Sequence, residues 1–253
     1  MAGLAFAAQA ELLQIPTGRG DTTLPVYWEQ ADNAKGTVIL LPGGEGTVKF
    51  KEGGNPKSNN FVVRTYPMWL AKGMNVMVVG TVREDGLTYP DRVSQEHADD
   101  LAKVATIAHQ RSPAPVWLVG TSRGTVSATS AAIKYAGTKT FDGVVLTSAV
   151  VIGKVPQSVP NQAIDKIDIP VLVYMHEQDA CPHCTLADAK GTIGKFKRSP
   201  IQAFKSVTGG SGATGNPCQG QHYHGFIGME EQAVSDVVNW IVNPVKIVSS
   251  SSS

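Results

Sequence analysis

The stretch Gly120-Thr121-Ser122-Arg123-Gly124 (GTSRG) directly follows the apolar run Val116-Trp117-Leu118-Val119 and precedes a segment of small residues typical of a helix. This order predicts a strand, a sharp turn and a helix, the context in which G-x-S-x-G exposes a nucleophilic serine. Glycines are needed on both sides of the serine because strand and helix pack so tightly that a flanking side chain would clash. Ser122 is therefore the candidate nucleophile.

Around this turn, short β-branched runs alternate with longer helical patterns, which predicts a doubly wound α/β fold with a mostly parallel sheet. Strands buried on both faces are expected at 37–41, 75–79, 116–119, 144–147 and 171–175. Two further strands, 23–30 and 201–207, are expected as antiparallel edge strands. Helices are expected at 61–72, 93–111, 122–136 and 229–242. The link between residues 150 and 170 is too short for a large helical lid.

Length and composition favour one domain, residues 11–245, in this chain of 253 residues. Charged residues make up 17% of the chain, against roughly 25% in an average globular protein. The formal net charge is +1, so the sequence indicates neither nucleic-acid binding nor a polybasic membrane contact. No apolar stretch approaches the ~20 residues that a membrane-spanning helix needs.

The two ends of the chain are set apart by composition. Residues 1–10 (MAGLAFAAQA) resemble the apolar region and A-x-A cleavage site of a secretion signal but lack a basic start. They are interpreted either as the remnant of such a signal or as an unstructured tail. Residues 246–253 end in five serines and are expected to form a flexible tail.

Serine hydrolysis needs a base to activate the hydroxyl and an acid to orient the base. Asp179 lies just past the predicted strand 171–175 and is the candidate acid, with Glu177 as the alternative. His224 is the preferred base, because Gly225 permits close backbone approach and Phe226 can anchor the loop. His222 is the competing base and otherwise a pocket residue. The four other histidines are expected on helix surfaces or in loops: His97, His109, His176 and His183.

A tetrahedral intermediate also needs two hydrogen-bond donors aimed at its oxyanion. One is expected to be the backbone N–H of Arg123, which follows the serine. The other is expected from Pro42-Gly43-Gly44-Glu45-Gly46, after the strand 37–41, with Gly44 as the donor. Gly43 and Glu45 are candidate pocket residues in the same loop.

The motifs LPGGEG and GTSRG, followed by Asp179 and His224-Gly225-Phe226, resemble the α/β-hydrolase superfamily, most of all its small, lid-poor bacterial esterases. The resemblance extends from about residue 37 to 240. It implies an eight-stranded, mostly parallel sheet and serine-triad hydrolysis of an ester-type bond, for which no metal or organic cofactor is expected. The short link 150–170 predicts an open cleft, which favours soluble short-chain esters or an exposed polymer chain as substrates. Many members have a His-Gly pair where this chain has Pro42-Gly43, so the family pattern does not by itself assign the second oxyanion donor.

The three cysteines allow two interpretations. Cys181-Pro182-His183-Cys184 follows a predicted strand, as a thioredoxin-like redox pair does. However, the chain lacks the separate small sheet that a thioredoxin domain would need. A structural disulfide between Cys181 and Cys218 is preferred, with Cys184–Cys218 as the alternative pairing. Such a bond persists in an oxidising compartment, so a periplasmic or secreted protein is expected.

Two further alternatives remain. One alternative is a zinc site, because five residues have side chains that can bind zinc: Cys181, His183, Cys184, His222 and His224. Their spacing fits no zinc-binding pattern, so no metal is expected. The other alternative is a binding protein of the same fold without catalytic activity.

Overall fold

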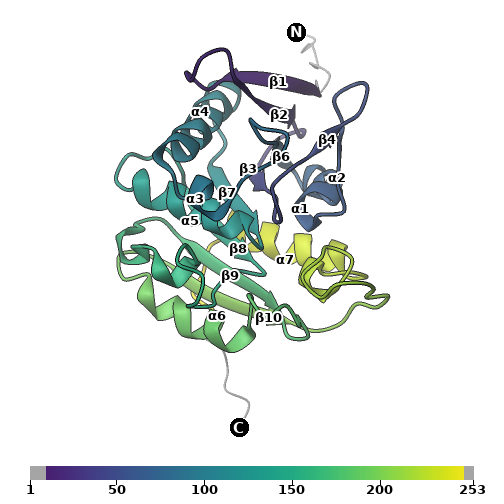
Figure 1. Cartoon of the computed structure of the whole chain (residues 1–253), viewed down its shortest axis with the longest axis vertical. Coiled ribbons are helices and arrows are strands. Elements are labelled where there is room, and N and C mark those ends of the chain that lie inside the picture. The colour runs from purple at the N-terminus through teal and green to yellow at the C-terminus, as the bar shows by residue number, and fades with distance from the viewer. Residues whose placement is uncertain (1–9, 248–253) are drawn as a thin grey trace.

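The computed structural model describes residues 10–247 (Figure 1). The secretion-signal-like segment and most of the serine-rich tail lie outside these residues. Among the residues described, no helix is both long and apolar enough to cross a membrane.

An eight-stranded sheet forms the centre of the molecule, in the order β1-β2-β6-β3-β7-β8-β9-β10. β1 and β2 are antiparallel to their neighbours, and the other pairings are parallel. The predicted mostly parallel α/β-hydrolase sheet is thereby confirmed. The strands are β1 (Glu11–Pro16), β2 (Thr23–Glu29), β3 (Gly36–Leu41), β6 (Met74–Val79), β7 (Val116–Thr121), β8 (Gly143–Thr147), β9 (Val171–His176) and β10 (Gln202–Val207).

Helices cover both faces of this sheet. They are α1 (Phe61–Arg64), α2 (Tyr66–Ala71), α3 (Tyr89–Arg92), α4 (Gln95–Arg111), α5 (Gly124–Lys134), α6 (Leu186–Thr192) and α7 (Glu230–Val242). α4 and α5 lie on one face, and α1, α2 and α7 on the other (Figure 1).

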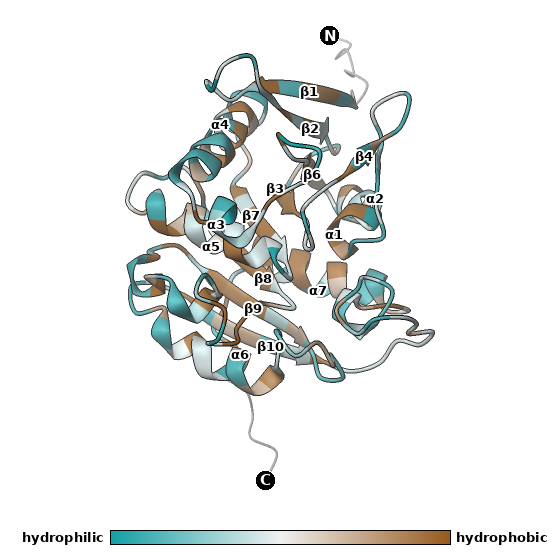
Figure 2. Cartoon of the chain, in the orientation of Figure 1, coloured by the Kyte–Doolittle hydropathy of each residue, from teal (hydrophilic) through white to brown (hydrophobic). Residues whose placement is uncertain are grey.

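The core therefore has two layers, one on each side of the sheet. Central strands such as β3 and β9 are predominantly hydrophobic (Figure 2). β3 shows how a single strand serves both layers. Its Ile39 and Leu41 pack in the layer under α4 and α5, whereas Val38 and Leu40 pack in the layer under α2 and α7. Successive side chains of a strand point to opposite faces, so a strand buried on both faces must be apolar throughout.

Two expectations for the sheet edges are wrong in part. The strand predicted at 23–30 is antiparallel, but β1 pairs outside it and forms the edge. The strand predicted at 201–207 is at the other edge, yet it runs parallel to β9. β1 and the short helices α3 and α6 were not predicted from the sequence.

The helix predicted at 61–72 is divided in two at Thr65. Pro67 has no backbone N–H to donate to Val63, which interrupts the helical hydrogen bonds. The Thr65 hydroxyl donates instead to the carbonyl of Phe61 at 2.7 Å and accepts from the indole N–H of Trp69 at 3.1 Å.

Three connections around the sheet matter for the site. The loop 45–60 contains a two-stranded hairpin, β4 (Lys49–Phe50) and β5 (Pro56–Lys57). The segment 208–221 contains no helix or strand. The link 150–170 contains two 3₁₀ turns, η1 (Val159–Asn161) and η2 (Ile164–Lys166), and no longer helix.

Candidate active site

Ser122 lies at the turn between β7 and α5 with a φ of +52°, in the left-handed region that residues with a side chain rarely adopt. Close packing makes both glycines of the motif necessary. A Cβ on Gly120 would lie 2.5 Å from the carbonyl oxygen of Gly124, and a Cβ on Gly124 would lie 2.1 Å from that of Leu41. Neither position tolerates a side chain without a backbone shift.

The backbone of Ser122 is also hydrogen-bonded on both sides. Its N–H donates to the carbonyl of Thr147 at 3.0 Å, and its carbonyl accepts from the Thr125 hydroxyl at 2.6 Å. Gly43 packs against the serine from the loop after β3, where a Cβ would come within 2.8 Å of the Ser122 Cβ. These contacts hold the serine in its unusual conformation.

Asp179 and His224, 45 residues apart, meet beyond the end of β9. Asp179 Oδ2 lies 2.8 Å from His224 Nδ1, and both side chains are buried. Asp179 Oδ1 accepts from the N–H of Cys181 at 2.9 Å. With the carboxylate ionised, Nδ1 carries the proton and Nε2 is left as an acceptor. Nε2 is buried and has no hydrogen-bond partner among the described residues.

The loop carrying His224 is anchored by hydrogen bonds from elements far along the chain. His224 lies in the 3₁₀ turn η4 (Tyr223–Gly225). The Ser148 hydroxyl donates to its carbonyl at 2.8 Å, and Arg64 donates to the carbonyl of Gly225 at 2.6 Å. A Cβ on Gly225 would lie 2.1 Å from the carbonyl oxygen of Gly220, so the expected close approach at this glycine is confirmed.

Phe226 supplies an apolar anchor for the same loop. Its side chain is fully buried, and its ring centroid lies 4.9 Å from that of Phe61 and 5.3 Å from that of Tyr174. Its φ of +56° turns the chain away from His224 towards α7. The aromatic contacts stabilise this conformation, which is unfavourable for a residue with a side chain.

The expected oxyanion donors lie on two different loops. Gly44, with a φ of +57°, follows β3, and Arg123 is the N-cap of α5. No acceptor within the described chain takes either backbone N–H. The Arg123 side chain stacks on the Tyr89 ring at 4.5 Å and donates to Glu45 at 3.3 Å. Glu45 therefore contacts Arg123 at the surface of the molecule.

A small pocket of about 20 Å³, room for about one water molecule, brings several of these residues together. It is lined by Gly44, Asn60, Phe61, Thr121, Ser122, Cys218, Gly220, His224 and Gly225. Gly43, Glu45 and His222 are not among the lining residues. Asn60 and Phe61 were missed because nothing in their local pattern distinguishes them from the rest of a helix start.

The alternative acid and base lie apart from the Asp179–His224 pair. Glu177 is exposed and accepts from the Ser206 hydroxyl at 2.8 Å. The His222 ring packs edge-on against Tyr223, with centroids 5.4 Å apart.

The four other histidines were expected on helix surfaces or in loops, and this is correct for only two of them. His109 and His183 are exposed as expected, but His97 and His176 are buried. His176 stacks on Tyr223 with a centroid distance of 4.7 Å.

A disulfide joins Cys181 to Cys218, so the preferred pairing is present. It ties the loop of Asp179 to the segment 208–221 that leads to His224. Cys184 is a free, fully buried thiol. Burial raises its pKa well above the usual value, which keeps it protonated and unreactive. The Cys181–Cys184 redox pair and the Cys184–Cys218 pairing are therefore absent from this structure.

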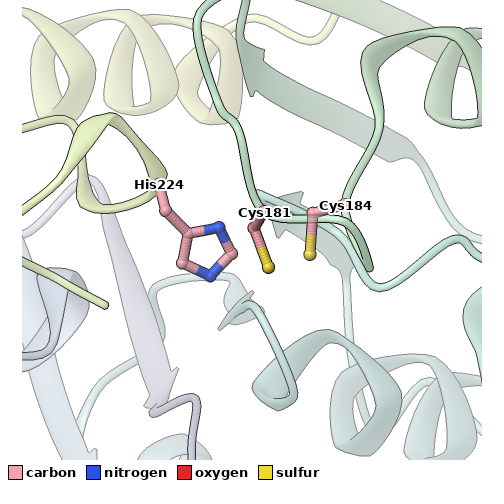
Figure 3. Close-up of side chains that lie close together, drawn as sticks. All are labelled: Cys181, Cys184 and His224. Atoms are coloured by element: carbon pink, nitrogen blue, oxygen red, sulfur yellow. The ribbon is translucent and has the colours of Figure 1, made fainter. Parts of the chain in front are cut away.

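Cys181, Cys184 and His224 form a cluster whose potential metal-binding atoms lie within 4.8 Å of one another (Figure 3). The His224 ring points towards the two sulfur atoms. Zinc requires thiolates and an unprotonated ring nitrogen. Here the Cys181 sulfur is bonded to Cys218, and His224 Nδ1 contacts Asp179. These residues do not fit a metal in this state, and His183 and His222 lie outside the cluster.

A buried polar network that was not predicted from the sequence contacts the Gly44 loop. The Arg92 side chain, 1% exposed, donates to the Ser127 hydroxyl at 2.9 Å. The same hydroxyl is 3.0 Å from His97 Nε2. Burial lowers the pKa of Arg92 to about 9, so it remains charged at neutral pH. Burial, with the nearby Arg92 charge, lowers the pKa of His97 to about 3, so this ring is neutral.

Comparison with known proteins shows the fold. No protein-family model matches the sequence, and no curated protein matches it. Many solved structures resemble it. A cold-adapted esterase from an Arctic intertidal metagenomic library is 15% identical, with a TM-score of 0.61 and 97% of each chain covered.

Two other structures give the same result. A hyperthermophilic esterase from the archaeon Pyrobaculum calidifontis is 16% identical, with a TM-score of 0.66, covering 92% of this chain and 83% of that one. A dienelactone hydrolase from Anabaena variabilis is 14% identical, with a TM-score of 0.60, covering 92% and 97%. The chain has the α/β-hydrolase fold.

The disulfide gives a prediction about stability. Cys181→Ser/Cys218→Ser removes a cross-link between residues 37 apart, which lowers the free energy of unfolding by up to about 4 kcal/mol. Denaturant titration of the variant and the native protein measures the loss. In iodoacetamide labelling without reductant, the native protein should react at no cysteine when folded and at one when unfolded. Three labelled cysteines under those conditions would contradict the disulfide.

His97 gives a prediction about pH dependence. Its folded pKa lies below its unfolded value of 6.5, so the unfolded chain binds the extra proton and stability falls as pH drops from about 6.5 towards 3. From pH 7.5 to pH 5.0 the loss from this group is about 2 kcal/mol. His97→Gln keeps a polar group there without titrating. Urea unfolding at both pH values should show a smaller loss for the variant, and equal losses would contradict the neutral buried histidine.

Proposed function

We propose that this protein is a serine hydrolase that cleaves carboxylic ester bonds through an acyl-enzyme, with Ser122, His224 and Asp179 as nucleophile, base and acid. The Asp179–His224 pair carries the proposal. It is buried, its Nδ1 side is occupied by a carboxylate, and its free Nε2 belongs to the residue that shares a pocket with Ser122. Structural similarity to esterases at the fold level is consistent with this chemistry.

In the first half of the reaction, Ser122 Oγ attacks the acyl carbon while His224 Nε2 takes the hydroxyl proton. Asp179 stabilises the imidazolium that forms. The N–H groups of Gly44 and Arg123 donate to the oxyanion of the tetrahedral intermediate. When the C–O bond breaks, the leaving alcohol takes the proton from His224, and the acyl group remains on Ser122.

In the second half, water replaces the alcohol. His224 Nε2 removes one proton from the water, whose oxygen attacks the acyl-serine carbon. The second tetrahedral intermediate collapses, Ser122 Oγ recovers the proton, and the carboxylic acid leaves. Protein side chains and backbone amides perform every proton transfer and charge stabilisation in this scheme.

The shape of the site favours short or exposed substrates. The pocket is small, and the link 150–170 contains only the two 3₁₀ turns η1 and η2. We therefore propose short-chain soluble esters, or an exposed ester in a polymer, as the substrate class. The Cys181–Cys218 disulfide supports export to the periplasm or the cell exterior, where such a bond persists.

Steady-state hydrolysis of p-nitrophenyl acetate and butyrate tests the proposal. Ser122→Ala removes the nucleophile and should lower kcat by about 10⁴-fold or more. Ser206→Ala is the matched control and should retain wild-type kcat, because the Ser206 hydroxyl, on β10, donates to exposed Glu177. Equal rates in the wild type and in Ser122→Ala would exclude this mechanism.

The same assay with a series of p-nitrophenyl esters tests the substrate class. The small pocket predicts that kcat/KM is highest for acyl chains of two to about six carbons, since it offers little room for a longer chain. Highest activity on long acyl chains, with activation at a lipid–water interface, would contradict the proposed substrate class while leaving the serine mechanism intact.

A further inference from the structure

Arg92, at the end of α3, contacts the loop that carries the expected oxyanion donor. Its guanidinium donates to the carbonyl of Gly44 at 3.0 Å and to that of Pro42 at 3.3 Å, besides Ser127. A guanidinium presents its N–H groups in a rigid planar fork, so one side chain holds several acceptors at fixed relative positions. Arg92 thus connects α3 and α5 to the loop after β3.

The contacts of Arg92 restrict the peptide planes of this loop. Three successive carbonyls are hydrogen-bonded: those of Pro42 and Gly44 to Arg92, and that of Gly43 to the N–H of Gly46 at 2.9 Å. In a trans peptide the N–H points away from the carbonyl. With the Gly43 carbonyl held by Gly46, the N–H of Gly44 is directed away from that turn.

Without Arg92, the peptides on either side of the Gly43–Gly44 peptide would lose the hydrogen bonds to their carbonyls, and the bond from Gly46 to Gly43 would alone hold the peptide that carries the Gly44 N–H. Gly43 and Gly44 have no side chains to limit their backbone torsions, and Gly44 has a positive φ of +57°. Rotation of either flanking peptide plane would turn the Gly44 N–H. An oxyanion donor contributes only when it is already oriented before the charge forms.

The charge of Arg92 is also unusual for its position. No carboxylate among the described residues forms a salt bridge with it. Asp91 is bonded to Arg83 and Thr88, and the Glu45 carboxylate contacts Arg123. A buried charge without a paired counter-ion is costly to the fold. It leaves a positive potential behind the loop where negative charge would develop during ester cleavage.

We propose that Arg92 is a positioning residue that fixes the Pro42–Gly44 loop, orients the Gly44 N–H and adds positive charge behind the oxyanion. This inference rests on the proposed serine hydrolase function. Arg92 lies outside the pocket, and by this inference it stabilises the transition state more than it stabilises the bound substrate.

Three variants separate this effect from stability. Arg92→Met keeps an unbranched side chain but removes the charge and all donors. Arg92→Lys keeps the charge without the fork. Ser127→Ala is the matched control, because it removes a buried partner of Arg92 but leaves both loop carbonyls bonded. For each variant, kcat, KM and the thermal unfolding temperature are measured with p-nitrophenyl butyrate.

Arg92→Met should lower kcat by about 10²- to 10³-fold, the usual effect of losing one oxyanion donor, with KM changed less than about threefold. Arg92→Lys should recover part of kcat through its charge. Ser127→Ala should stay within about threefold of wild type even if its unfolding temperature falls. A substrate-derived boronic acid, which forms a tetrahedral adduct on the serine, should bind Arg92→Met more weakly by a similar factor, whereas the carboxylate product should bind unchanged.

A kcat for folded Arg92→Met equal to that of Ser127→Ala would overturn the inference. If Arg92→Met does not fold, Arg92→Lys decides: a kcat reduced at least tenfold supports the inference, and wild-type kcat overturns it. Ser122→Ala is measured in parallel. Activity retained in Ser122→Ala would reject the serine mechanism itself, a result distinct from any outcome of the Arg92 variants.

Discussion

The close contact between Gly124 and the end of β3 determines how the candidate site is assembled. A Cβ on Gly124 would lie 2.1 Å from the Leu41 carbonyl oxygen, so the backbones of the serine turn and the β3 loop are in direct contact. β3 and β7 are parallel neighbours, so both strands end at the same edge of the sheet. The relative position of Ser122 and Gly44 is therefore set by packed backbone, with Arg92 holding the loop from behind.

The other half of the site depends on constraints of a different kind. His224 follows the segment 208–221, which contains no helix or strand to position it. Its place is set instead by Asp179, by Ser148, by the buried ring of Phe226 and by the disulfide at Cys218. Cross-links and side-chain contacts thus perform in this loop the role that sheet hydrogen bonds perform around Ser122.

Much of this architecture could be read from the sequence. The strands buried on both faces are continuous apolar runs, and glycine spacing marks the serine turn. The position of Asp179 follows from its place just past a strand, since parallel strands end at a common edge. The preferred histidine was distinguished from His222 by the glycine and phenylalanine that follow it, and both have the packing roles expected of them.

Other features depend on contacts that no local pattern reveals. β1 (Glu11–Pro16) is half-buried at an edge and lacks a continuous apolar run, and the direction of β10 depends on its pairing with β9. Arginine is normally exposed, so nothing local predicts that Arg92 is buried. Its burial depends on hydrogen-bond acceptors that lie about 35 to 50 residues away in the chain. The break at Thr65, by contrast, was readable from Pro67.

Covalent labelling with a fluorophosphonate, followed by peptide mass spectrometry, tests the central claim most directly, because it reports an activated serine without assuming a substrate. The account predicts one phosphonyl group per folded chain, on the peptide that contains Ser122, and much slower labelling in His224→Ala. Labelling at another serine, or no labelling of the folded protein, would contradict the assignment of Ser122 as the nucleophile.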